Sequence, residues 1–143
     1  MKDGLSSVSH AVYQNVHHFE WCTKYRYEVF NSGELINACE ASIRRAAERH
    51  GIVVCELSVM PEHVHALVEI RPSMSVSRAE GLLKGASAHE LFAAFPRLRA
   101  RYWGGHLWSP GRFSRSLGDI GVETARRYVR YENDSRQQKL AAY

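Results

Sequence analysis

The chain has 143 residues, of which 45% are hydrophobic and 24% are charged, and its formal net charge is +4. These values are typical of one globular domain, so we expect a single domain over 1–143, with 1–10 as a flexible leader. No apolar run approaches the ~20 residues of a membrane span, so we expect no membrane insertion. The three cysteines include no C-x-x-C pair, so we expect reduced thiols in a cytoplasmic protein, with a zinc cage as the weaker alternative.

The chain begins with a predicted strand and helix. Residues 12–27 are rich in β-branched and aromatic side chains, which favour a strand. Apolar residues at helical spacing then predict a helix over 34–50. Ser32 is a suitable N-cap for this helix, and Gly51 is a suitable stop.

The middle of the chain predicts a β-hairpin. Residues 52–60 and 63–71 both have strand-like composition. Pro61 and Glu62 form a tight connection between them, because proline cannot join a central strand ladder.

The last part predicts a helix, a strand and a second helix. The first helix covers 76–95 and ends at Pro96. A loop rich in glycine and aromatic residues follows over 101–111, and then come a short strand over 112–117 and a helix over 122–138.

This order of elements predicts an α+β fold. Strand, helix, strand, strand, helix and strand form a split β-α-β arrangement of the ferredoxin-like type. We therefore expect an antiparallel sheet with helices on one face, plus an added C-terminal helix.

Two histidines flank one apolar residue at the start of the predicted third strand. Side chains in a strand alternate between faces, so His63 and His65 share a face and lie roughly 7 Å apart at their Cα atoms. Val64 and the alternate residues after it take the opposite face and can enter the core. Two imidazoles at this spacing can reach one divalent metal ion.

The C-terminal helix supplies a phenol and a carboxylate. Residues four apart on a helix share a face, so Tyr128 and Glu132 project together. If this helix packs on the histidine face of the sheet, a metal ion, two imidazoles, a carboxylate and a phenol meet at one site. A phenol has a pKa near 10 and is a poor nucleophile, but a metal ion can polarise a phosphodiester oxygen and help its attack.

Arginine outnumbers acidic residues over 95–130, next to the aromatic loop. A local excess of arginine is typical of phosphate-binding surfaces, and exposed aromatic rings can stack on bases. An ordinary solvated face is the alternative interpretation. Of Trp103 and Trp108, we expect one to lie in the core, while the other is free to stack.

Five ordered blocks of the chain resemble the single-tyrosine HUH transposases, small enzymes that move hairpin-ended insertion sequences through single-stranded DNA. The resemblance runs from about residue 17 to residue 133. The blocks are WCTKYR at 21–26, MPEHVH at 60–65, LKGAS at 83–87, WGGHLWSP at 103–110 and the tyrosine helix.

The resemblance implies a role for each matching residue. His63 and His65 match the metal-binding histidines, and Tyr128 matches the nucleophile that forms a 5′-phosphotyrosine with single-stranded DNA. Glu132 takes the position of the third metal ligand, which is usually glutamine in the family. The implied ion is Mg²⁺ or Mn²⁺.

The resemblance also implies partners. The family acts as a homodimer on DNA hairpins, and the tyrosine helix of one subunit commonly serves the histidines of the other. Lys24, Arg26, Lys84 and Ser87 match blocks associated with DNA binding.

Two departures from the family pattern lie on the tyrosine helix. Glu132 keeps a good ligand for a hard metal ion but adds negative charge beside the phosphate. Tyr131 is a second candidate nucleophile, but the residue four positions after it is Ser135, a poor metal ligand. Tyr128 is therefore the preferred nucleophile.

Three other functions compete with transposition. A domesticated relative would process genomic palindromes with the same chemistry. A catalytically decayed relative would only bind hairpin DNA, which the glutamate at position 132 favours weakly. A metal-dependent hydrolase of small molecules is the most distant alternative, since its histidine motif usually belongs to longer barrel chains.

Overall fold

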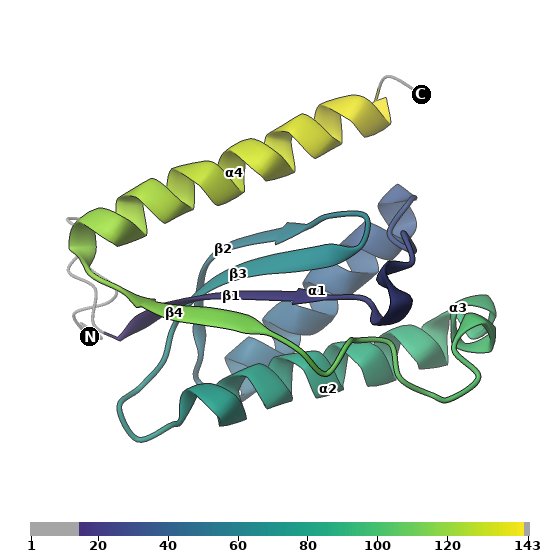
Figure 1. Cartoon of the computed structure of the whole chain (residues 1–143), viewed down its shortest axis with the longest axis horizontal. Helices are drawn as coiled ribbons and strands as arrows, with labels where there is room; N and C mark the ends of the chain where they lie inside the picture. The colour runs from purple at the N-terminus through teal and green to yellow at the C-terminus, as the bar shows by residue number, and fades with distance from the viewer. Residues whose placement is uncertain (1–14, 142–143) are drawn as a thin grey trace.

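The computed structural model describes residues 15–141, in which four strands form one sheet (Figure 1). The expected leader over 1–10 lies outside these residues. In chain order the elements are β1 (Val16–Cys22), a 3₁₀ turn η2 (Lys24–Arg26), α1 (Gly33–Arg49), β2 (Val53–Val59), β3 (His63–Glu69), α2 (Val76–Ala94), α3 (Pro96–Arg101), β4 (Phe113–Leu117) and α4 (Asp119–Ala141).

The sheet has the strand order β2-β3-β1-β4, and its pairs are antiparallel. The prediction of a ferredoxin-like α+β fold is therefore confirmed, including the hairpin of β2 and β3. The central strands are β3 and β1, which carry most of the polar side chains of the site described below.

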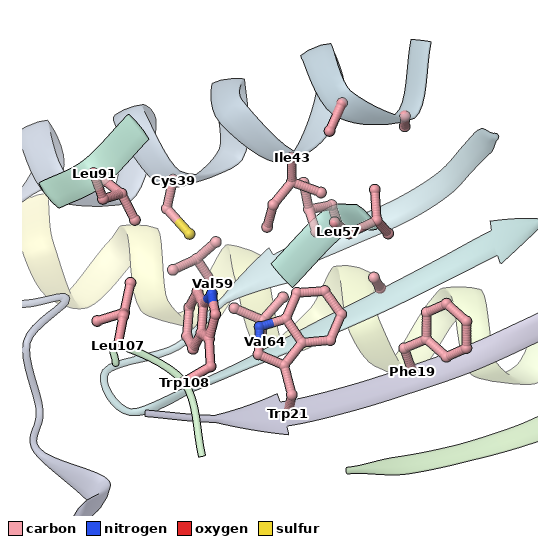
Figure 2. Close-up of a cluster of buried hydrophobic side chains, with 14 of the residues drawn as sticks. Phe19, Trp21, Cys39, Ile43, Leu57, Val59, Val64, Leu91, Leu107 and Trp108 are labelled. Atoms are coloured by element: carbon pink, nitrogen blue, oxygen red, sulfur yellow. The ribbon is translucent and has the colours of Figure 1, made fainter. Parts of the chain in front are cut away.

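Helices α1 and α2 cover one face of the sheet, and α4 crosses the other face (Figure 1). The main core lies between the sheet and the first two helices. The β3 residues Val64, Ala66 and Val68 point into it, as the strand alternation predicts. Figure 2 shows this core, in which the rings of Trp21 and Trp108 meet edge to face.

The contacts of α4 with the sheet are partly apolar and partly ionic. Val122 and Ala125 pack on Val16 and Leu67 in a small second core. Arginines extend this attachment along β2: the Arg126 and Arg130 guanidiniums pair with the Glu56 carboxylate, and buried Arg136 donates to the Val59 and Phe30 carbonyls. These contacts fix α4 over the face that carries the histidines.

Local sequence explains the starts of the two core helices. The Ser32 side chain accepts a hydrogen bond from the Leu35 amide at the start of α1, as predicted, and Ser75 does the same for the Arg78 amide in α2. Gly51, just after α1, has a φ of 71°, which glycine adopts without steric cost.

Most predicted boundaries lie within two residues of the observed ones, and the larger differences have local causes. The first strand ends at Cys22 rather than continuing to residue 27, because Tyr25 and Arg26 have φ values of 65° and 54° that no strand tolerates. Helix α4 begins at Asp119 rather than 122. Pro96 ends α2 but also starts α3, a position at which proline is well suited to a helix. Within residues 15–141, no helix has both the length and the apolar character that crossing a membrane requires.

Candidate active site

Polar side chains from two neighbouring strands face α4. His63 and His65 lie on either side of buried Val64 on β3, so both imidazoles lie on the same face of the sheet. Antiparallel pairing puts Glu20 of β1 opposite His65. His18 lies two residues before Glu20 and therefore shares its face.

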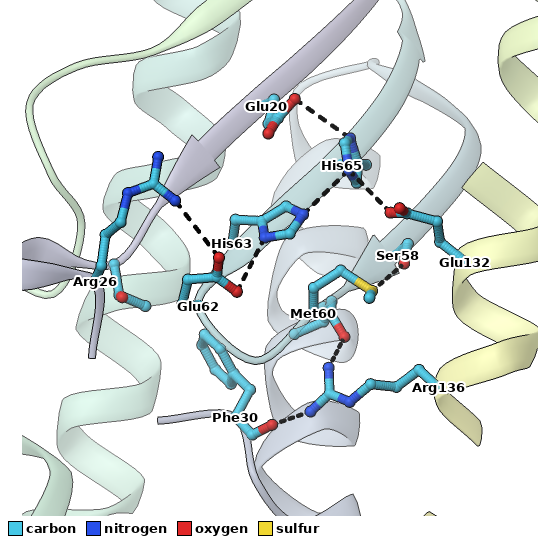
Figure 3. A network of polar contacts seen from close by, with 12 residues as sticks. Glu20, Arg26, Phe30, Ser58, Met60, Glu62, His63, His65, Glu132 and Arg136 are labelled. Atoms are coloured by element: carbon cyan, nitrogen blue, oxygen red, sulfur yellow. Dashed lines mark hydrogen bonds and ion pairs between the residues drawn. The ribbon is translucent and has the colours of Figure 1, made fainter. Parts of the chain in front are cut away.

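Helix α4 brings the predicted phenol and carboxylate to these histidines. Glu132 Oε1 lies 3.1 Å from His65 Nε2, and the Tyr128 hydroxyl donates a 2.7 Å hydrogen bond to Glu132 Oε2. The Tyr128 and His65 rings meet edge to face, with centroids 5.9 Å apart. The structure thus brings all four predicted residues, Tyr128, His63, His65 and Glu132, together within one chain; Figure 3 shows the two histidines and Glu132.

The surroundings of the two imidazoles determine which ring nitrogens carry protons. His63 Nδ1 lies 3.2 Å from Glu62 Oε1, and an ionised carboxylate only accepts, so we place the proton on Nδ1. Without a metal ion, His65 Nε2 can donate to Glu132 Oε1 at 3.1 Å. A metal ion on Nε2 requires the proton on Nδ1, where His18 Nε2 at 3.0 Å and Glu20 Oε1 at 3.7 Å can accept it. Both Nε2 atoms then present lone pairs, 3.2 Å apart, on the side of Glu132.

This convergence of lone pairs fits a divalent metal ion. The ligand atoms of His63, His65 and Glu132 all lie within 4.8 Å of one another. Glu132 Oε1 is buried and lies 3.1 Å from His65 Nε2. Two imidazole nitrogens and a carboxylate oxygen without intervening protons repel one another, and a cation removes this repulsion.

A second group of possible ligands shares one of these histidines. Ligand atoms of His18, Glu20 and His65 also lie within 4.8 Å of one another. This group uses the Nδ1 side of His65, whereas the first group uses Nε2. We therefore interpret His18 and Glu20 as partners that orient the His65 ring, a role that carboxylates and carbonyls commonly have behind metal-binding histidines.

Burial favours the neutral form of His65 and His18. It lowers the pKa of His65 from its ordinary value of 6.5, against the opposing effect of the Glu20 carboxylate. Burial also lowers the pKa of His18, and the neighbouring His65 adds to this effect. Neutral imidazole is the form that binds metals, so the shift of His65 favours metal binding.

The environment of Tyr128 has the opposite effect on its reactivity. The hydrogen bond to Glu132 raises the pKa of the Tyr128 phenol, and the Glu132 charge adds to this. The Tyr128 side chain is nevertheless 51% exposed, so a phosphodiester can reach it from solvent. Tyr131 is 70% exposed and lies three positions further along α4, outside the contact of Tyr128 with His65.

The four predicted DNA contacts lie in different environments. Arg26 is exposed at the end of η2 and pairs with Glu62 at 3.4 Å, while Lys24 is the first residue of the same turn. The Lys84 ammonium is mostly buried and donates to the Ser109 carbonyl at 2.9 Å.

Ser87 does not lie on the surface. Its side chain is fully buried, donates to the Leu83 carbonyl and accepts a 3.0 Å hydrogen bond from Trp108 Nε1. This position argues against a direct DNA contact, because the hydroxyl already has partners in the core. The same contact identifies Trp108 as the core tryptophan of the pair, whereas Trp103 is 88% exposed.

Sequence reasoning missed His18, Glu20 and Glu62. The alternation of His18 and Glu20 along β1 is visible in the sequence, but their contact with His65 depends on the register between two strands far apart in the chain. Glu62 directly precedes His63 in the sequence. The turn before β3 determines that the Glu62 carboxylate contacts the His63 ring. The three cysteines are free, as expected, and Cys39 is buried.

Comparison with known proteins agrees with this geometry. Residues 11–132 match the family model described as IS200-like transposase. The chain is 34% identical over 123 residues to the ISDra2 transposase TnpA of Deinococcus radiodurans, covering 86% of this chain and 87% of that protein. It is 31% identical over 112 residues to the transposase for insertion sequence element IS200 of Salmonella typhimurium, covering 78% and 73% of the two chains.

Solved structures show the same fold. The crystal structure of a candidate transposase from Deinococcus radiodurans matches with a TM-score of 0.69 and 31% identity over 89% of this chain and 97% of that one. A REP-associated tyrosine transposase bound to a REP hairpin matches with a TM-score of 0.57 over 82% of this chain and 64% of that one. At 12% identity, the second match shows a shared fold alone.

Proposed function

This chain belongs to the family of IS200-like transposases, and from that premise we propose that it cleaves and rejoins single-stranded DNA at hairpin-marked element ends through Tyr128. The observation that carries this proposal is the meeting of Tyr128, Glu132, His63 and His65 on one face of the sheet. Membership of a transposase family makes the chain a DNA-processing enzyme. The hairpin-bound structural relative is consistent with hairpin DNA as the substrate.

In the proposed reaction the Tyr128 oxygen attacks a phosphodiester phosphorus. The bond from phosphorus to the 3′-oxygen breaks, a tyrosine–phosphate bond forms at the 5′ end, and the 3′-oxygen takes up a proton to become a hydroxyl. The phenolic proton already lies in the hydrogen bond to Glu132, whose carboxylate can accept it. Religation reverses these steps, so the phosphotyrosine conserves the energy of the broken bond and no high-energy cofactor is required.

We propose that His63, His65 and Glu132 bind Mg²⁺ or Mn²⁺ at the three ligand atoms that converge between β3 and α4. Such an ion would supply Lewis-acid polarisation of the scissile phosphate. The chain's own contribution is to orient both imidazoles, through Glu62 behind His63 and through Glu20 and His18 behind His65, while burial favours the neutral form of His65.

We also propose that the enzyme acts as a homodimer in the cytoplasm, where its DNA substrate is found. Within the single chain, α4 lies on its own sheet, so Tyr128 faces its own histidines. An exchange of α4 between subunits would reproduce the same contacts in trans. Mixing Tyr128→Phe protein with His65→Ala protein tests this exchange. Restored cleavage in the mixture requires an active site shared between subunits. A mixture that stays inactive indicates that each active site lies within one subunit.

The first test is adduct formation. The protein is incubated with labelled single-stranded DNA from a pool of hairpins with randomised flanks, with Mg²⁺ or Mn²⁺, and run on a denaturing gel. A metal-dependent, slowly migrating adduct supports the proposal. Hairpin binding without any adduct would instead favour the decayed binding protein, and Glu132→Gln would then be the variant with which to seek restored activity.

A further inference from the structure

A group of aromatic rings lies beside the candidate active site without a role in the proposed chemistry. Tyr25 of η2 is 61% exposed and Tyr27 is 37% exposed. Both rings rest on Tyr102, which is only 2% exposed and packs against Phe92. We call Tyr25, Tyr27 and Tyr102 the tyrosine platform.

The backbone under the platform is held in an unusual conformation. Tyr25 and Arg26 both have positive φ, which is uncommon in residues other than glycine and is retained where surrounding contacts enforce it. The Lys24 amide donates to the Leu107 carbonyl, and the Arg26 amide donates to the Thr23 carbonyl. The Tyr102 hydroxyl donates to the Lys24 carbonyl at 3.2 Å, so the buried ring also fixes the turn.

This conformation leaves most of the Tyr25 side chain exposed, with the Tyr27 ring beside it at a centroid distance of 5.3 Å. The Tyr25 and Tyr102 rings are nearly parallel, with a 9° angle between their planes and centroids 6.2 Å apart. Tyr102 therefore supports one side of Tyr25, while most of the Tyr25 side chain faces solvent. A flat aromatic group can continue this stack on the outer side.

The charge around the platform is mainly positive. The Lys24 ammonium lies 5.5 Å from the centroid of Tyr25, and the Arg101 guanidinium lies 4.5 Å from that of Tyr27. Arg26 is exposed beside them, with Glu62 as its acidic partner, and Glu28 is a second nearby acidic residue in the sequence. Aromatic rings flanked by cations match the chemistry of a nucleotide, in which a base is joined to a phosphate.

The platform is directly connected to the candidate active site. β1 ends at Cys22, which pairs with His63, and the next amide, that of Thr23, donates to the Glu62 carbonyl. The Glu62 carboxylate contacts both Arg26 and His63 (Figure 3). A single strand of DNA that reaches the histidines from this side therefore passes the turn that carries Tyr25.

We propose that the tyrosine platform binds an unpaired base of the single-stranded DNA next to the hairpin, by stacking it on Tyr25 while Lys24 and Arg101 contact its flanking phosphates. This inference rests on the proposed function, since it names how that substrate is held. It assigns a stacking role to Tyr25, which takes no part in bond breaking.

The test compares two DNA ligands and two variants. One ligand is a hairpin with a single-stranded flank, and the other is the same hairpin with a blunt end. Tyr25→Leu removes the aromatic face but keeps an apolar side chain at the same backbone position, and Tyr25→Phe keeps the face and removes the hydroxyl. Equilibrium affinities are measured by fluorescence anisotropy, and thermal unfolding of each protein checks that the turn still folds.

We expect Tyr25→Leu to bind the flanked hairpin about ten-fold more weakly, the size expected for one lost base–aromatic stack, and to bind the blunt hairpin normally. Tyr25→Phe should bind both ligands like the wild type. A 2-aminopurine placed in the flank should be quenched by the wild type and less by Tyr25→Leu. Equal affinity and equal quenching for wild type and Tyr25→Leu would overturn the stacking role.

The outcomes separate this proposal from the proposed function. If the wild type binds neither ligand and forms no adduct, the function itself fails. A second outcome is that the wild type binds the flanked hairpin and forms the adduct, with Tyr25→Leu binding the same hairpin at unchanged affinity. In that case the proposed function stands and only the stacking role of Tyr25 is refuted.

Discussion

The Tyr128 hydroxyl donates a 2.7 Å hydrogen bond to Glu132, one turn further along α4, and Glu132 in turn contacts His65 at 3.1 Å. The proposed nucleophile is thus connected to the proposed metal ligands through a single carboxylate. The hydrogen bond to this carboxylate raises the pKa of the Tyr128 phenol. The same carboxylate is the chain's departure from the glutamine usual in the family that it resembles.

Replacing the nucleophile should separate catalysis from binding. Tyr128→Phe removes the attacking oxygen and leaves the half-exposed ring in place, so we expect no covalent adduct, with hairpin affinity within about two-fold of the wild type. Adducts are measured on denaturing gels and affinity by anisotropy. Tyr131→Phe is the matched control and should keep forming adducts; an adduct that depends on Tyr131 instead would reassign the nucleophile.

Removing the charge at position 132 should make the phenol of Tyr128 more acidic. The hydrogen bond to Glu132 raises the pKa of Tyr128, so we expect Glu132→Gln to lower it in metal-free protein. The pKa is measured by NMR on ring-labelled tyrosine, with the Tyr128→Phe spectrum identifying the resonance among the seven tyrosines. An unchanged Tyr128 pKa in Glu132→Gln would show that the hydrogen bond does not persist in solution.

Glu62 should support the metal site without contacting the ion. Its carboxylate holds the Nδ1 proton of His63, so we expect Glu62→Ala to weaken Mn²⁺ binding by about 10- to 100-fold. Titration calorimetry measures the affinity, and the paramagnetic resonance spectrum of bound Mn²⁺ reports the ligand geometry. Glu48→Ala, at an exposed position of α1, is the control for lost negative charge, and equal affinities in the two variants would exclude a specific role for Glu62.

The metal-free protein should lose stability as the solution becomes mildly acidic. Burial lowers the pKa of His18 and His65 in the folded state, so the unfolded chain binds more protons as the pH falls below their ordinary value of 6.5. The stabilising contribution of these neutral histidines is complete above that pH and is lost as the pH falls through the folded-state pKa.

Urea unfolding in the presence of a chelator, at pH 7.5 and pH 5.5, measures this effect. His18→Phe should reduce the difference between the two pH values, because one buried titrating ring is removed. A free energy of unfolding that is the same at both pH values in the wild type would contradict the assigned neutral state.

Ser87 should matter for stability rather than for DNA binding. Ser87→Ala leaves the buried Trp108 Nε1 without its acceptor, and we expect a loss of about 1–3 kcal/mol in the free energy of unfolding. Hairpin affinity should not change. If Ser87→Ala reduced the affinity for hairpin DNA without changing stability, the DNA contact implied by the sequence resemblance would be supported instead.

The sequence alone determined the pairs of side chains that act together locally. Strand alternation puts His63 and His65 on the same face of a strand. Helical periodicity puts Tyr128 and Glu132 on the same face of a helix. Neither result depends on the rest of the chain. The order of the elements was also sufficient to predict the ferredoxin-like sheet. The predictions of shared faces succeeded because they depend on backbone geometry over a few residues, and the sheet was predictable because few topologies suit that order of elements.

The tertiary structure decided how these pairs meet and which other residues join them. The register of β1 against β3 brings His18 and Glu20 to His65, and packing of α4 on β2 brings Glu132 there as well. Packing also placed Ser87 in the core, although its sequence block indicated a surface role. Contacts between distant segments depend on the summed packing of the whole chain, so local periodicity could not specify them.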